Sequence, residues 1–269
     1  MTSGAPFFST SGRYLFGVVH LLPLPGSPGY RGDPQAVRES ARRDADHLLA
    51  GGLDGFIVEN FGDVPFHKDQ VELAVVAEMT RIVTELVERA GPEPWIGVNV
   101  LRNDAAAALS VATAAGARFI RVNVHAGVMF ADQGIIEGKA ADTLRLRKKL
   151  ASSVAILADV AVKHAVAPAG FELGAAAQEA AYRGLADGLV VTGPSTGSPS
   201  ELEEVDEVRL AVPDRPIWVG SGVTDSTVAE TLRHAHGVIV GTSLKEDGDV
   251  RRPVDPARVK QLVALAMKS

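Results

Sequence analysis

The sequence predicts a single (β/α)8 barrel, and three observations support this fold. Eight short β-branched runs alternate with longer helical patterns along the whole chain. Most of these runs are apolar almost throughout, which is typical of parallel strands covered on both faces. The chain has 269 residues, and a typical barrel of this class has about 250. We therefore expect an α/β protein with one barrel domain.

The predicted strands are short runs that begin after a stretch of fourteen residues. We expect residues 1–14 to form an N-terminal extension and residues 15–269 to form the barrel domain. In chain order, the expected strands are Leu15–His20, Gly55–Asn60, Trp95–Val100, Arg118–Val124, Val154–Val160, Gly188–Thr192, Pro216–Gly220 and Gly237–Gly241.

Capping and stop signals mark the predicted helices between these strands. Asp33-Pro34 opens the first helix with proline at its first position. Gly91 and Gly116 end the second and third helices, as glycine commonly does. The expected helices are Pro34–Ala50, Val71–Ala90, Ala105–Ala115, Ala140–Ala151, Ala175–Ala186, a sixth with a capping box at Ser200 and Glu203, Asp225–Ala235 capped by Thr224, and a last one opened by Asp255-Pro256.

The alternative fold is a doubly wound open sheet, which also alternates strands and helices. Its dinucleotide fingerprint would follow the first strand. The segment there, His20-Leu-Leu-Pro-Leu-Pro-Gly26, contains no Gly-x-Gly-x-x-Gly, so the barrel is favoured. No linker-like change of composition divides the chain, and we expect one domain.

Composition excludes several classes of function. The 27 basic and 33 acidic residues give a net charge of −6, which excludes a nucleic-acid polymer as the main partner but allows a local phosphate site. The chain has no cysteine, so disulfides, thiolate nucleophiles and cysteine-ligated metals are excluded, and a reducing cytoplasm is expected. Residues 1–14 do not resemble a signal peptide, and no run of 18 apolar residues predicts membrane insertion.

The candidate active site lies at the carboxyl ends of the predicted strands, where barrels build their active sites. A polar side chain that only satisfies a nearby loop is the simpler explanation for any one of these positions. Six polar strand ends at one mouth are more than a purely structural barrel needs. The polar strand-end residues are His20, Glu59 with Asn60, Asn99, Asn123 with His125, Asp159 and Thr192.

The seventh and eighth strands end in small residues instead, and there we expect a phosphate-binding pocket. Glycine lets the backbone approach a ligand closely and expose its N–H groups, while serine and threonine add hydroxyl donors. Barrels frequently bind phosphate at this position. The expected phosphate-binding residues are Gly220, Ser221, Gly222, Gly241, Thr242 and Ser243.

Carboxylates carry the expected acid–base chemistry. Glu59 and Asp159 end apolar strands, where burial can raise a carboxyl pKa into a useful range. Lys163, four residues after Asp159, is a candidate acid or electrophile. His20 is a fourth catalytic candidate that could ligate a metal with either carboxylate. A divalent metal is possible, although no ligand spacing supports one, and no cofactor is predicted.

Two loops, 126–139 and 60–67, are too elaborate for plain connections. The segment 126–139, which contains Asp132, exceeds the usual βα loop of about 2–6 residues and is a candidate lid over the substrate. The proline-rich segment 21–32 is a candidate wall of the mouth or an oligomer contact, and we expect a homo-oligomer. The expected substrate contacts are Asn99, Asn123, His125, Asp132 and Thr192.

Several ordered motifs resemble one known family. They include Gly17-Val-Val-His-Leu-Leu-Pro-Leu-Pro-Gly-Ser-Pro28, Val58-Glu-Asn-Phe-Gly-Asp63, Gly97-Val-Asn-Val-Leu-Arg-Asn-Asp104, Phe119-Ile-Arg-Val-Asn-Val124, Asp132-Gln-Gly-Ile-Ile-Glu-Gly138, Val219-Gly-Ser-Gly-Val223 and Gly237-Val-Ile-Val-Gly-Thr-Ser-Leu-Lys245. The chain thus resembles the BtpA/SgcQ family of the ribulose-phosphate-binding barrel class. The resemblance implies a cytoplasmic barrel with a phosphate pocket at strands seven and eight. It also implies a link to photosystem I biogenesis in some members and to carbohydrate use in others.

Three functions follow as hypotheses. The first is an enzyme that acts on a small phosphorylated sugar or nucleotide-like substrate, with isomerisation, aldol-type cleavage and glycosidic-bond cleavage all open. The second is a non-catalytic assembly factor with a vestigial mouth, and the third is a sensor that binds a phosphorylated ligand without turnover.

Overall fold

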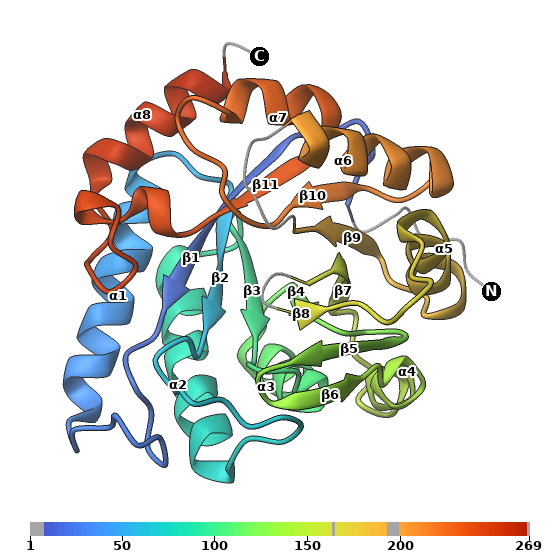
Figure 1. The fold of residues 1–269 in the computed structure, drawn as a ribbon. Coiled ribbons are helices and arrows are strands. Elements are labelled where there is room, and N and C mark those ends of the chain that lie inside the picture. Colours follow the sequence, from blue (N-terminus) through green and yellow to red (C-terminus); the bar gives the residue numbers. More distant parts are fainter. Residues whose placement is uncertain (1–7, 163–164, 193–198, 268–269) are drawn as a thin grey trace.

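A closed barrel of eight parallel strands forms the centre of the molecule (Figure 1). The computed structural model describes residues 8–162, 165–192 and 199–267. Around the barrel the strand order is β1-β11-β10-β9-β7-β4-β3-β2, which confirms the predicted fold class. The barrel strands are β1 (Tyr14–His20), β2 (Gly55–Glu59), β3 (Trp95–Asn99), β4 (Phe119–Val122), β7 (Ala155–Ala161), β9 (Gly188–Val191), β10 (Ile217–Val219) and β11 (Gly237–Val240).

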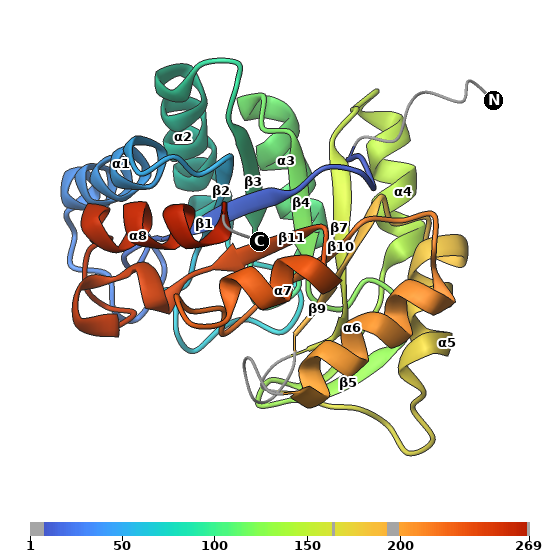
Figure 2. The ribbon, with the colours of Figure 1, turned by 90° about the horizontal axis from the view of Figure 1, so that it is seen from above.

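Helices surround the strands, and Figure 2 shows α1 to α3 on one side and α6 to α8 on the other. Asp33 caps α1 as predicted, because its Oδ1 accepts a hydrogen bond of 2.9 Å from the N–H of Ala36. The helices are α1 (Pro34–Ala50), α2 (Leu73–Ala90), α3 (Ala105–Ala115), α4 (Ala140–Lys149), α5 (Leu173–Gln178) continued by a π-helical turn (Glu179–Arg183), α6 (Pro199–Ala211), α7 (Val228–His234) and α8 (Pro256–Ala266).

The candidate lid segment is not a plain loop. It forms a β-hairpin of β5 (Val128–Ala131) and β6 (Gly134–Glu137), and β5 also pairs with the short strand β8 (Ala165–Val166). Gly134 supplies the positive φ of +98° that the tight turn requires. Met129 and Ile136 are buried against Val124, so the hairpin has a small core of its own.

The floor of the barrel is closed by Phe8, which lies in the predicted N-terminal extension. The side chain of Phe8 is fully buried. Its ring stacks on Trp95 at 4.8 Å and packs edge-on against Trp218 at 4.7 Å and Phe119 at 5.6 Å. Aromatic side chains bury large areas and favour these geometries, so the extension contributes to the core.

A buried ion pair joins α1 to the segment that follows β11. Lys245 Nζ donates a hydrogen bond of 2.7 Å to Asp44 Oδ2, and the two side chains are only 1% and 4% exposed. Asp44 Oδ1 also accepts a hydrogen bond of 3.2 Å from the N–H of Val254. The pair therefore holds the start of the C-terminal region against the first helix.

Within the described part of the chain, no helix has both the length and the apolar character needed to cross a membrane.

Candidate active site at the carboxyl ends of the strands

A cavity of about 960 Å³ opens at the carboxyl ends of the barrel strands. Its lining includes His20 from β1, Glu59 from β2, Asp159 from β7 and Thr192, which directly follows β9. The strands bring these residues together because parallel strands in a barrel all end at the same rim.

All six expected phosphate-binding residues line this cavity. Gly222 has a φ of +64°, a conformation that glycine adopts without steric cost. The hydroxyl of Ser243 donates a hydrogen bond of 2.8 Å to the carbonyl of Val223. That bond fixes the Ser243 side chain and connects the loop after β11 to the loop after β10. The hydroxyl of Ser221 is buried and has no hydrogen-bond partner among the described residues.

Asp159 forms a bidentate ion pair with Arg121, a residue of β4. Arg121 Nε and Nη2 each donate a hydrogen bond of 2.9 Å, one to each carboxylate oxygen of Asp159. Asn123 Nδ2 donates a third bond of 3.0 Å to Asp159 Oδ2. Burial opposes the charge on Arg121, but the adjacent Asp159 carboxylate outweighs it and raises the pKa of Arg121. The cavity therefore contains a fixed positive group.

The amide of Asn123 has a settled orientation. Only its nitrogen can donate to a carboxylate, so the bond to Asp159 directs Nδ2 toward that residue. Asn123 Oδ1 is then a buried acceptor without a hydrogen-bond partner in residues 8–162, 165–192 and 199–267. A buried acceptor in this position is favourable when a ligand supplies the donor.

Glu59 is buried beside the Arg121–Asp159 pair and has a perturbed pKa. Burial raises the pKa of Glu59 above its ordinary value of 4.5, although Arg121 and the bond from Asn99 act in the opposite direction. Asn99 Nδ2 donates that bond to Glu59 Oε1 over 2.6 Å. The other carboxyl oxygen, Oε2, lies 3.7 Å from His20 Nε2.

His20 is held in its neutral form. Burial, assisted by the charge of Lys245, lowers the pKa of His20 from 6.5 to about 3. Phe61 packs against the imidazole ring with a centroid distance of 4.6 Å. His20 Nδ1 is buried and has no hydrogen-bond partner in the described structure. With a pKa of about 3, His20 is a weak base near neutral pH, and the neutral imidazole is suited to donate a hydrogen bond to a substrate oxygen.

Some predicted site residues lie elsewhere. His125 is buried, and its Nε2 lies 2.8 Å from the carbonyl oxygen of Gly184, so its side chain supports the π-helical turn and does not line the cavity. Asp132 lies at the exposed tip of the β5–β6 hairpin and accepts a bond from the neighbouring Gln133. Asn99 contacts Glu59 rather than the cavity itself. Lys163 lies outside the described residues.

The strand-end rule missed three arginines that line the cavity. Arg121 lies within β4, Arg102 lies in the loop after β3, and Arg258 lies on α8. A charge inside an apolar strand was a usable signal for Arg121, because a buried charge has to be paired. Nothing in the local pattern marked Arg102 or Arg258.

The described residues contain no group of three or more His, Asp or Glu side chains placed to hold a metal ion. His20 and Glu59 approach each other at 3.7 Å, but Asp159 is engaged by Arg121 and Asn123.

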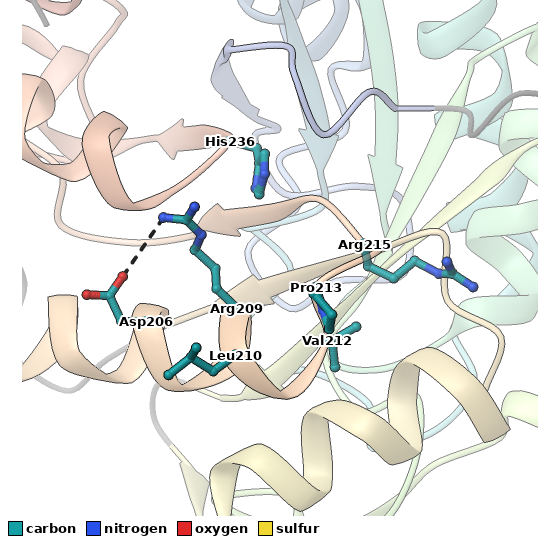
Figure 3. A pocket seen from close by; sticks show the side chains of 7 residues that line it. All are labelled: Asp206, Arg209, Leu210, Val212, Pro213, Arg215 and His236. Carbon is teal, nitrogen blue, oxygen red and sulfur yellow. Dashed lines mark ion pairs between the residues drawn. The ribbon is translucent and has the colours of Figure 1, made fainter.

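A second pocket, of about 410 Å³, lies at the opposite end of the strands, near the residues that precede β10 and β11. Figure 3 shows its seven lining side chains. Arg209 donates a bond of 2.8 Å to the carbonyl of His234 and lies 3.9 Å from Asp206, and Arg215 donates a bond of 2.7 Å to Asp214. Because protein groups already engage both arginines, and barrel active sites form at the carboxyl ends, we place the site at the mouth.

Comparison of sequences identifies close relatives. The family model described as the BtpA family matches residues 12–268. A Photosystem I biogenesis protein BtpA of Synechocystis sp. is 48% identical over 249 residues, which are 93% of this chain and 86% of the relative. An uncharacterized protein of Thermococcus kodakarensis is 46% identical and covers 94% of both chains. An uncharacterized mitochondrial protein of Caenorhabditis elegans is 33% identical over 95% of this chain and 93% of its own.

Solved structures with the same fold include several enzymes. Tryptophan synthase of Mycobacterium tuberculosis superposes with a TM-score of 0.60 at 17% identity, covering 95% of this chain and 93% of the other. Phosphoribosyl anthranilate isomerase of Thermococcus kodakaraensis gives a TM-score of 0.54 at 14% identity, covering 96% and 100%. At such identities the similarity shows the fold alone.

Proposed function

The chain belongs to the BtpA family, and from that premise we propose that it is an enzyme that performs acid–base chemistry on a small phosphorylated sugar or nucleotide-like substrate. The observation that carries the proposal is one cavity lined by two unlike sets of residues. One set is the glycine and hydroxyl loops after β10 and β11, and the other is His20, Glu59, Arg121 and Asp159.

The loops and the charged residues have different roles in the proposed reaction. The loops hold the phosphate, so the non-reacting end of the substrate supplies binding energy that positions the reacting end. The buried hydroxyl of Ser221, which has no partner among the described residues, suits an anion there. The N–H of Gly220 and the hydroxyl of Ser243, by contrast, already donate to the carbonyls of Val191 and Val223. This arrangement directs the rest of the substrate toward the charged residues that line the cavity.

Proton transfer is assigned to Glu59. Burial raises the pKa of Glu59 above its ordinary value, which favours the protonated form that a general acid needs. Neutral His20, 3.7 Å away, donates a hydrogen bond to the substrate. An apo site often has such loose distances and tightens when substrate binds.

Arg121 and Asp159 supply the electrostatic part of the mechanism. The guanidinium is held by two bonds of 2.9 Å, so it stabilises developing negative charge without reorganising during the reaction. Asp159 fixes Arg121 and Asn123 together, which makes it a positioning residue as much as a candidate base. Enolate-forming isomerisation and aldol-type cleavage both use this combination of a base and a fixed cation, and glycosidic-bond cleavage uses a carboxyl pair.

A binding test comes first. Isothermal titration with a panel of sugar phosphates and nucleoside monophosphates should find ligands that bind the wild type and not Ser221→Asp, because the new carboxylate repels phosphate. Equal binding to both proteins, or binding to neither, would refute the phosphate site.

A chemical test follows with any ligand that binds. In D2O, proton NMR reports exchange of a ligand C–H with solvent, the signature of proton abstraction, and accumulation of products. We expect Glu59→Gln to slow the reaction by about 10²–10⁴-fold while the unfolding midpoint stays near that of the wild type. A Glu59→Gln protein that reacts at the wild-type rate would remove Glu59 from the mechanism.

The second candidate function is an assembly factor. Its support is the Synechocystis relative, which is 48% identical and is described as a Photosystem I biogenesis protein. Glu59→Gln, which leaves the Arg121–Asp159 pair intact, discriminates between the two functions in a complementation assay in that cyanobacterium. A scaffold keeps its biogenesis activity with this substitution, whereas a catalyst loses it and remains folded.

A further inference from the structure

The proposed phosphate loops consist of neutral residues. Gly220, Ser221, Gly222 and the segment 241–243 carry no formal charge, and the whole chain has a net charge of −6. A phosphate monoester carries about −1.5 to −2 charges at pH 7. Backbone N–H groups and hydroxyls bind an anion without a formal charge of their own, so a cation close to the loops adds electrostatic attraction.

Three arginines line the cavity, and they are not equivalent. Arg121 lies next to the loop after β10, since a Cβ at Gly220 would be 3.1 Å from its Nη2, but its Nε and Nη2 both donate to Asp159. Arg102 lies in the loop after β3, a strand that is separated from β10 and β11 by β1 and β2 in the barrel order. Arg258 contacts the loop after β11, since its Nη1 donates to the carbonyl of Ser243 over 3.3 Å, and no carboxylate holds it as closely as Asp159 holds Arg121.

Arg258 is placed by a well-defined helix start. α8 begins at Pro256, and Asp255 Oδ1 caps it by accepting a bond of 2.8 Å from the N–H of Ala257. The second oxygen of Asp255 lies 3.8 Å from Arg258 Nε. Charge-assisted bonds are usually about 2.7–2.9 Å long, so both contacts of Arg258 are long, and its side chain is 42% exposed. The guanidinium has five N–H donors, enough to bind phosphate as well.

Another carboxylate that lines the cavity is already neutralised. Asp249 lines the cavity, and both of its oxygens accept bonds from Arg251, at 3.0 Å and 2.8 Å. Asp249 therefore weakens the positive potential of Arg258 less than an unpaired carboxylate would.

We infer that Arg258 is the cation that binds the phosphate of the ligand and that it selects a dianionic monoester over a monoanionic diester. This inference rests on the proposed function and adds the charge class of the substrate. A guanidinium matches two phosphate oxygens at once, and the fixed turn at the start of α8 directs it toward the loop after β11.

The test compares inorganic phosphate with dimethyl phosphate in isothermal titration at low salt. We expect Arg258→Gln to weaken phosphate binding by about tenfold or more and to change dimethyl phosphate binding much less. Arg258→Lys keeps the positive charge but loses the planar pair of N–H donors, so its affinity for phosphate should lie between those of the wild type and Arg258→Gln. Arg233→Gln is the matched control, because it removes the same charge from a residue of α7 that lines a pocket at the other end of the barrel.

The outcomes separate this inference from the proposed function. If Arg258→Gln binds phosphate as well as Arg233→Gln does, while Ser221→Asp loses binding, the phosphate site stands and the role of Arg258 is refuted. An equal loss for phosphate and dimethyl phosphate would also refute the selection of a dianion. If the wild type binds neither phosphate nor any phosphorylated ligand, both proposals are overturned. A circular dichroism melt of each variant distinguishes lost binding from lost folding.

Discussion

The buried pair of Asp44 and Lys245 allows a quantitative test of the structure that needs no substrate. Lys245→Met removes the ammonium and leaves the Asp44 carboxylate, 4% exposed, without its bond of 2.7 Å. Removing one partner of a buried pair costs about 3–5 kcal/mol. Arg43, whose Nη2 lies 3.3 Å from Asp44 and which is 44% exposed, retains part of the compensation. We therefore expect a loss near 3 kcal/mol in the free energy of unfolding.

The double variant provides the decisive comparison. Asp44→Leu with Lys245→Met removes both charges, so the remaining cost is chiefly the unpaired N–H of Val254, about 1–3 kcal/mol. Urea unfolding followed by tryptophan fluorescence measures the wild type, both single variants and the double variant. We expect the double variant to be more stable than either single variant. The reasoning is refuted if Lys245→Met unfolds like the wild type, or if the losses of the single variants simply add.

Two further perturbations test the floor and the mouth of the barrel. Phe8→Ala should lower the free energy of unfolding by about 3–5 kcal/mol, because it empties a buried aromatic site. The control Phe130→Ala, at an exposed position, should change the free energy of unfolding little. Similar urea midpoints for the two variants would contradict the packing of Phe8. The second perturbation changes pH. The folded-state pKa of His20, about 3, lies below its ordinary value of 6.5. The stability that neutral His20 contributes is therefore present above pH 6.5 and is lost as pH falls toward 3, by up to about 1.4 kcal/mol per pH unit. His20→Asn should flatten this part of the stability–pH curve, and an unchanged slope would show that His20 is not buried in its neutral form.

The eight barrel strands could be predicted because each is an apolar run with clear ends. The hairpin of β5 and β6 could not, since its strands have only four residues each. Its exposed positions, among them Phe130 and Ile135, obscure the alternation that marks a strand. Tertiary burial of Met129 and Ile136 stabilises the hairpin, and sequence periodicity over so few residues does not report it.

The candidate site was predictable where it follows the strand ends. Glu59, Asp159 and the two glycine-rich loops line the cavity because strand direction alone places them there. His125 also follows a predicted strand end in the sequence. Its side chain nevertheless bonds to the carbonyl of Gly184, and no local sequence pattern indicates that orientation. Arg258 comes from a helix more than ten residues after β11, so its approach to Ser243 depends on how α8 packs.

The position of Phe8 also constrains the order in which the chain can fold during synthesis. Phe8 is among the first residues made, but its ring contacts Trp95, Phe119 and Trp218, and Trp218 is made only after most of the chain. The aromatic floor cannot be completed before β10 leaves the ribosome. Until then Phe8 has no complete binding site, and the part of its ring that Trp218 covers in the folded protein lacks that contact in every shorter nascent chain.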